Sequence, residues 1–187
     1  MTFLITDSDK PLLMDTVPAL KLTHFNGEPA RGEVYAYMRC YACNGALHLS
    51  FTEFDEAPPE GTHMALALMP ADKDDSFLYL TLDKAAKCDL KLLDARTNNC
   101  VKALTPPSVS IVTGSDEQGL YWCAETVIEK EIFDKVLSSP MKSGSVFAGN
   151  VFLCKDGEAA FGSAFKVPIE ESVPTTAGFD VFTLVPY

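Results

Sequence analysis

The sequence has few basic residues and no long apolar run, and each shortage argues against a class of protein. Its 15 lysines and arginines stand against 26 aspartates and glutamates, so the 187 residues carry a formal net charge of -11. Because nucleic-acid binding depends on a basic surface that neutralises phosphates, we expect no nucleic-acid partner. No apolar run approaches the roughly 18 residues of a transmembrane helix, so we expect no membrane partner. With 47% hydrophobic and 22% charged residues, the composition is that of a globular protein.

The chain also lacks signs of secretion. Its first residues, Met1 to Asp7, have no basic region and only a short apolar run, so they do not resemble a secretory leader and we expect a cytoplasmic protein. Six cysteines are too few for a disulfide-rich scaffold. Cys40 and Cys43 form a lone CxxC motif with no second pair at zinc-site spacing, which favours a structural role.

Familiar catalytic motifs are missing as well. The three histidines belong to no HExxH motif, and the sequence contains neither GxSxG nor a phosphate-binding P-loop. Carboxylates are plentiful, but a glycosidase acid pair is defined by its separation in space and cannot be identified from sequence. We therefore favour a binding protein over an enzyme and predict no catalytic residue.

One acidic turn is a candidate for a metal ion. Asp72, Asp74 and Asp75 lie close together in the sequence, and carboxylate oxygens are the ligands that calcium prefers. Their spacing is not that of an EF-hand, and acidic turns are mostly solvated. We predict no metal site and no cofactor, with calcium at this turn as the weaker alternative.

The clearest local signal is a hairpin around Asn44 and Gly45. This dipeptide readily adopts the two positive φ values of a type I′ turn, and runs rich in apolar and aromatic residues flank it. A two-residue loop pairs Cys43 with Ala46 and fixes the register of the whole ladder. Because side chains alternate, one face then carries Val34, Ala36, Met38, Cys40, Ala42, Leu47, Leu49 and Phe51, and we expect it to be core.

The other face of the hairpin is aromatic and polar. It carries Tyr35, Tyr37, Arg39 and Tyr41 on one strand and His48, Ser50, Thr52 and Phe54 on the other. Cys40 and Cys43 fall on opposite faces in this register, which argues against a metal shared between them.

Further strand-like runs follow, separated by turn-forming residues. They are His63–Met69, Phe77–Leu82, Cys88–Leu93, Val109–Thr113, Leu120–Ile128, Ser145–Cys154, Phe161–Val167 and Val181–Val185, with Val17–Phe25 as a further strand near the start. One short amphipathic helix is predicted from about Glu129 to Leu137. Many short strands without βαβ alternation predict an all-β, antiparallel β-sandwich of the jelly-roll type. We expect a single domain over residues 1–187, with residues 1–16 as an N-terminal extension.

Several segments, taken in order, resemble those of carbohydrate-binding module family 9-like domains, which are DOMON-like β-sandwiches. The resemblance runs from about Val34 to Tyr187. The matching segments are Ala46–Glu56, Met64–Pro70, Phe77–Asp83, Leu120–Glu125 leading into the helix at Phe133, Gly149–Cys154 and Gly178–Phe179. The resemblance implies the sandwich fold and a saccharide ligand.

The chain departs from that family at positions that bear on ligand binding. Family members that bind sugar clamp the ring between two tryptophans, whereas this chain has only Trp122, which matches a structural strand. It has Ala65 where an acidic residue is usual and Thr81 and Asp83 where Asn and Glu are usual, and no histidine follows His63. The fold therefore carries over better than the clamp.

The aromatic and polar hairpin face supplies most candidate site residues. Aromatic faces pack on the apolar C–H patches of sugars while polar groups bond the hydroxyls, so Tyr35, Tyr37, Arg39, Tyr41 and His48 are the predicted contacts. The alternatives are that these tyrosines pack beneath loops or form a protein interface. Asn150, in the Gly-Asn step, either bonds a loop backbone, which we favour, or reaches the ligand.

The sequence therefore predicts a non-catalytic domain that binds a small saccharide or a related polar ligand. A sandwich scaffold that has lost the ligand is the main alternative, and a glycan-processing hydrolase is the third. The sequence leaves the sugar and the oligomeric state open.

Overall fold

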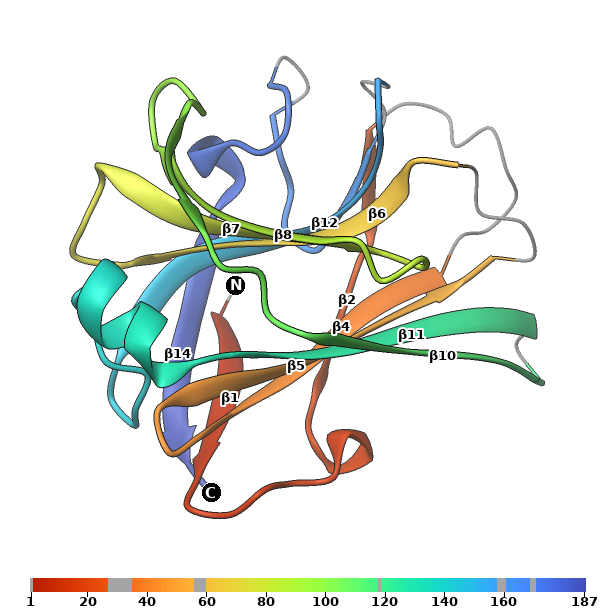
Figure 1. Cartoon of the computed structure of the whole chain (residues 1–187), viewed down its shortest axis with the longest axis horizontal. Helices are drawn as coiled ribbons and strands as arrows, with labels where there is room; N and C mark the ends of the chain where they lie inside the picture. Colours follow the sequence, from red (N-terminus) through yellow and green to blue (C-terminus); the bar gives the residue numbers. More distant parts are fainter. Residues whose placement is uncertain (1, 27–34, 56–59, 118, 158–160, 169–170) are drawn as a thin grey trace.

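The computed structural model describes residues 2–26, 35–55, 60–117, 119–157, 161–168 and 171–187 (Figure 1). Within these residues the chain forms a 14-stranded sheet. The strands are β1 (Thr2–Ser8), β2 (Ala19–Lys21), β3 (His24–Asn26), β4 (Tyr35–Cys43), β5 (Ala46–Phe54), β6 (Thr62–Pro70), β7 (Ser76–Asp83), β8 (Cys88–Asp94), β9 (Cys100–Leu104), β10 (Val109–Asp116), β11 (Gly119–Ile128), β12 (Val146–Lys155), β13 (Phe161–Ser163) and β14 (Asp180–Pro186). Short helical turns are η1 (Met14–Thr16), η2 (Ile132–Val136) and η3 (Thr176–Gly178).

The sheet folds into two layers. Its strand order is β10-β11-β5-β4-β1-β14-β12-β6-β7-β8-β9, and Figure 1 shows β4, β5, β11 and β10 in one layer facing β12, β6, β7 and β8 in the other. The order places β1 and β14 where the sheet passes from one layer to the other. This confirms the predicted β-sandwich. A strand is observed at each run that the sequence predicts as a strand. The predicted helix corresponds to η2, a π-helical turn.

The position of the N-terminal residues differs from the prediction. The sequence predicts that residues 1–16 extend from the domain, whereas β1 lies inside the sheet. It pairs in parallel with β14 on one side and with β4 on the other. Phe3 and Ile5 point into the core, whereas Leu4 is exposed. The short apolar run at the start is therefore a strand with alternating burial, and the sandwich is antiparallel except at β1.

The hairpin of β4 and β5 has the predicted register. Cys43 pairs with Ala46 and Met38 with Phe51, and the turn residues Asn44 and Gly45 have φ values of 52° and 84°. The predicted core side chains of both strands are buried between the layers, apart from Val34, which lies outside the described residues. The hairpin thereby fixes which side chains point outward.

The core lies between the layers, and a second cluster lies outside one of them. The main cluster gathers inward side chains from both layers, including Phe51, Phe147 and Phe182, whereas Phe77 and Phe152 pack beneath the segment that contains Val167 and Phe179. Because that segment covers the outside of the layer that contains β7 and β12, the outward side of the β4–β5 layer is the broad face available for a site.

No helix in the described part of the chain is long and apolar enough to cross a membrane.

Candidate functional site

Four strands build one continuous outer face. In the observed registers β11 pairs with β5, and β10 pairs with β11, so the aromatic and polar side of the hairpin continues across two more strands. We call this surface the outer face. It consists of Tyr35, Tyr37, Arg39 and Tyr41 on β4, His48, Ser50, Thr52 and Phe54 on β5, Tyr121, Cys123, Glu125 and Val127 on β11, and Ser110, Val112 and Gly114 on β10.

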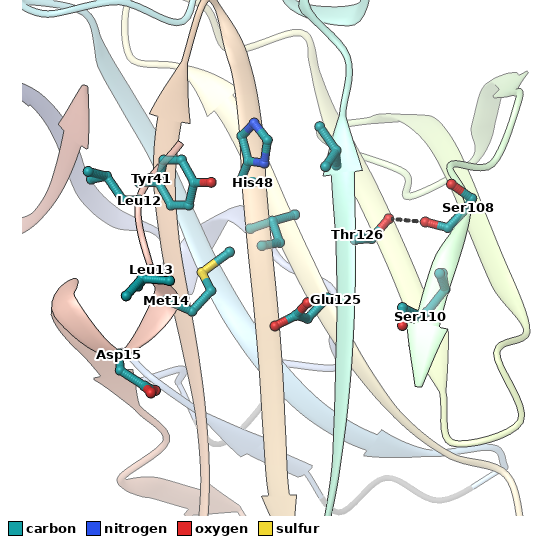
Figure 2. Close-up of a pocket in the computed structure, with 13 residues that line it drawn as sticks. Leu12, Leu13, Met14, Asp15, Tyr41, His48, Ser108, Ser110, Glu125 and Thr126 are labelled. Carbon is teal, nitrogen blue, oxygen red and sulfur yellow. Dashed lines mark hydrogen bonds between the residues drawn. The ribbon is translucent and has the colours of Figure 1, made fainter. Parts of the chain in front are cut away.

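A pocket of about 730 Å³ lies at one end of the outer face. Figure 2 shows the segment after β1 on one side, with residues of β10 and β11 on the other. Its lining combines apolar, hydroxyl and carboxylate groups, namely Leu12, Leu13, Met14, Asp15, Tyr41, His48, Leu49, Ser108, Val109, Ser110, Glu125, Thr126 and Val127. Such a mixture, in a cavity of this size, is typical of small-ligand sites.

Tyr41 and His48 form a stacked pair in this pocket. Their ring centroids lie 4.6 Å apart with an interplanar angle of 6°, because the two residues are direct cross-strand partners in β4 and β5. Tyr41 is only 4% exposed, since Val17, Leu12 and Met14 pack against it. Burial raises the pKa of the Tyr41 phenol, so it stays neutral. The pair is a rigid wall of the pocket, and Tyr41 packs beneath the segment after β1, which is the loop-covered alternative that the sequence left open.

Arg39 holds the pocket wall together. Its Nη1 donates to the backbone oxygen of Val17 at 2.5 Å and lies 3.4 Å from the oxygens of Met14 and Asp15, while its guanidinium lies 5.5 Å from the centroid of the Tyr37 ring. The sequence predicted that Arg39 would bond a ligand. In the structure this nitrogen instead fixes the segment that carries Met14 and Asp15, so we interpret Arg39 as a positioning residue.

We expect His48 to titrate below its ordinary pKa. Burial lowers the pKa of His48 from 6.5, although the carboxylate of Glu129 acts in the opposite direction. The unfolded chain then binds the proton more tightly than the folded chain. The contribution of His48 to the free energy of unfolding is therefore fully present above about pH 6.5 and falls as the pH drops below that value. An NMR titration of the ring protons, assigned with His48→Gln, measures this pKa; a value above 6.5 would contradict the burial argument.

Glu125 is one of several pocket residues that sequence reasoning missed, with Asp15 and Ser110 among the others. It lies on β11 opposite Ser50 of β5 and is an exposed residue that lines the pocket (Figure 2). On the next position of β11, the hydroxyl of Thr126 donates to the backbone oxygen of Ser108 at 2.9 Å, which joins the start of β10 to β11. The alternation of side chains along β11 indicates that Glu125 points outward. Only the pairing of β11 with β5 places it in the same pocket as His48.

An aromatic cluster occupies the other end of the outer face. Tyr35, Tyr37, Phe54 and Tyr121 have ring centroids 5.4 to 6.5 Å apart and are tilted against one another. Gly114 lies beside Tyr121, and a Cβ at that position would come within 2.6 Å of the Tyr121 hydroxyl. The predicted site residues thus divide into two groups, with Tyr41 and His48 in the pocket and Tyr35 and Tyr37 in the aromatic cluster.

Asn150 lies outside this site. It is a fully buried residue of β12, in the opposite layer, and its side chain forms four hydrogen bonds. Its Nδ2 donates to the oxygens of Phe165 and Gly178 at 2.9 and 2.8 Å, and its Oδ1 accepts from the amides of Val151 and Phe165 at 2.8 and 3.0 Å. These four bonds to backbone groups favour the structural role for Asn150 over a ligand contact.

Neither the acidic turn nor the CxxC motif belongs to a metal-binding group of side chains among the described residues. Among the described residues, no three His, Cys, Asp or Glu side chains are grouped so that they could hold a metal ion, and Asp72, Asp74 and Asp75 are among them. Cys40 packs in the main core while Cys43 packs against Tyr41, so the two thiols lie on opposite faces. Burial raises the pKa of Cys40 to about 12, which makes it an unreactive thiol.

Three solved structures share this fold. A "putative carbohydrate-binding protein" from Bacteroides uniformis has a TM-score of 0.70 and 12% identity, with 98% of each chain covered. A carbohydrate-binding module of family 9 from Caldicellulosiruptor kristjanssonii, solved with glucose, has a TM-score of 0.60 and 10% identity, covering 100% of this chain and 97% of that one. Its structure with cellotriose gives 0.59 and 10%, covering 100% and 95%. The chain thus has a family 9-like fold, as the sequence resemblance implied.

Comparisons by sequence give no match. No protein-family model matches the chain, and the comparison with curated proteins found no match. At identities of 10 to 12% the likeness to the solved structures concerns the fold. The function therefore has to be argued from the side chains of the outer face.

Proposed function

We propose that this protein is a non-catalytic carbohydrate-binding domain whose ligand occupies the pocket of the outer face. The observation that carries the proposal is the pocket itself, a cavity of about 730 Å³ in which Glu125, Asp15 and Ser110 line the same space as the stacked Tyr41 and His48. Neighbours of the same fold solved with glucose and cellotriose support a saccharide as the ligand class.

The lining matches the two kinds of contact that a sugar ring makes. A pyranose presents apolar C–H patches and a rim of hydroxyl groups. The side chains of Leu13, Met14 and Val127 offer apolar surface to the C–H patches. The carboxylates of Asp15 and Glu125 accept hydrogen bonds from the hydroxyl groups of the sugar. Ser110 can both donate and accept. The arrangement replaces a tryptophan clamp by a rigid wall and a set of polar groups.

A hydrolase is the second candidate, because two carboxylates line this one pocket. Asp15 and Glu125 come from opposite walls of it, and glycoside hydrolysis requires a pair of carboxyl groups on either side of the scissile bond. Incubation with each saccharide that binds, followed by chromatography for cleavage products, separates the two functions. We expect the saccharide to be recovered intact.

A screen of mono- and oligosaccharides by thermal shift tests the proposal. A ligand present at 100-fold its Kd stabilises the folded state by about 2.7 kcal/mol, which raises the Tm of a chain this long by roughly 5 to 10 °C. Ser110→Tyr places a large side chain into the pocket from an exposed position of β10 and should remove this shift. Its own Tm should stay close to that of the parent, because tyrosine suits an exposed strand position.

Thr113→Tyr is the matched control. Thr113 is also exposed on β10, but its side chain alternates to the other side of the strand from Ser110. This variant should keep the full ligand-induced shift. If no saccharide shifts the Tm of the parent protein, the proposal fails and the outer face is better explained as the interface of a scaffold domain.

A further inference from the structure

The charge of the pocket points to a narrower class of ligand. We infer that the pocket selects saccharides with a free, protonated amino group over neutral and acidic saccharides. This inference rests on the proposed function, since it specifies the ligand of the same pocket. It comes from the ionisable groups that surround the cavity, taken from each element that contributes to its wall.

The groups that line the cavity are acidic or neutral. Asp15 follows β1 on the turn η1, and Glu125 projects from β11, so carboxylates reach the cavity from two opposite walls. The two remaining titratable lining residues are Tyr41 and His48, and burial favours the neutral form of both. None of the lining residues that the structure describes is a lysine or an arginine. The described lining therefore carries negative charge and no positive charge of its own.

Two basic side chains on elements that build the pocket have partners of their own. Arg39 donates to backbone oxygens of the segment 14–17 and is not among the lining residues. Lys130, which follows β11, pairs with Asp134. Glu129 adds a further carboxylate close enough to influence His48. Neither Asp15 nor Glu125 forms a salt bridge with another described residue, so both remain available to a cationic ligand.

These charges decide between saccharides of otherwise similar shape. A uronic acid would place its carboxylate next to Asp15 and Glu125, where like charges repel. An N-acetylated or simple neutral sugar gains hydrogen bonds but no charge attraction. A protonated amine gains both, because the hydrogen bond between an ammonium and a carboxylate is about twice as strong as one between neutral groups. The order of affinity should therefore be amino, neutral and acidic sugar.

Calorimetry with three oligosaccharide sets tests this order in the full chain. The probes are glucosamine oligomers, their N-acetylated counterparts and uronic acid oligomers of equal length, at low ionic strength and at a pH where the amine is protonated. We expect the amino sugar to bind on the order of tenfold more tightly than the N-acetylated one, as an attraction of about 1 kcal/mol or somewhat more would produce. The preference should weaken as salt is added.

Glu125→Gln separates the charge of the pocket from its shape. The variant should keep its affinity for the N-acetylated oligomer and lose most of the preference for the free amine. Glu117→Gln is the matched control, since it removes one negative charge from the exposed turn between β10 and β11, outside the pocket lining, and should leave the preference intact. Equal affinities for amino and N-acetylated oligomers, or tightest binding of the uronic acid, would overturn this inference and leave the proposed function standing. No binding of any set would overturn both.

Discussion

Replacing Asn150 by leucine should lower the free energy of unfolding by about 4 kcal/mol or more. The substitution removes four buried hydrogen bonds, two donated by Nδ2 and two accepted by Oδ1. It leaves the oxygens of Phe165 and Gly178 and the amides of Val151 and Phe165 without this partner, and each buried group that loses its bond costs about 1 to 3 kcal/mol. Because domains are stable by only about 5 to 15 kcal/mol, most of the stability is at risk.

Urea unfolding measures this loss, and two further variants show its origin. Asn150→Asp keeps both acceptor bonds but cannot donate, and it should also be strongly destabilising because a carboxylate would be buried beside two carbonyl oxygens. Asn99→Ala, at an exposed turn, should change the stability by less than about 0.5 kcal/mol. A loss of less than about 1 kcal/mol for Asn150→Leu would mean that the side-chain amide of Asn150 contributes little to the stability of the sandwich.

The hairpin shows how much local sequence determines. Asn44 and Gly45 adopt the positive φ values that a type I′ turn requires, and a two-residue loop leaves one register for the strands it joins. Because one face of the pair is buried against the other layer, a shift by one residue would expose Met38, Cys40 and Leu49. The turn and the burial pattern thus agree, and the prediction is correct along the described length of both strands.

The strands that were missed have weaker local signals. β1 has seven residues, and both of its partners in the sheet, β4 and β14, are distant from it in sequence. β9 is an edge strand whose residues Cys100 to Ala103 are all exposed, so no hydrophobic alternation marks it. In both cases the information lies in the partner strand rather than in the segment itself.

The site was predicted only in part for the same reason. The side of the hairpin that carries Tyr41 and His48 follows from alternation, and the structure places both in the pocket. Whether Tyr41 is open or covered depends on where residues 12–17 pack, and their position depends on the pairing of β1 with β4. Glu125 reaches the pocket through the pairing of β11 with β5. Pockets form between segments that are remote in sequence, so a hairpin alone cannot define one.

The second large effect is expected at Trp122, on the inward side of the layer that carries the pocket. Its Nε1 donates to Oε2 of Glu53 at 2.7 Å, and both residues are buried. Trp122→Phe should lower the free energy of unfolding by about 3 kcal/mol, because it removes this bond from a buried carboxyl group and leaves a smaller ring in the core. Unfolding of the variants is followed by circular dichroism, since Trp122 is the only tryptophan of the chain.

A double-mutant cycle with Glu53→Leu, which has no acceptor for the indole N–H, isolates the contribution of the hydrogen bond. Glu53 has a further interaction within the protein, so Glu53→Leu alone measures more than the bond to Trp122. In the cycle that further term appears in both the single and the double variant and cancels, which leaves the coupling between the two side chains. We expect a coupling of about 1 kcal/mol, as for a typical hydrogen bond within a protein. Additive effects would show that Trp122 stabilises the sandwich through ring packing alone, and that the buried Glu53 is held by its other contact.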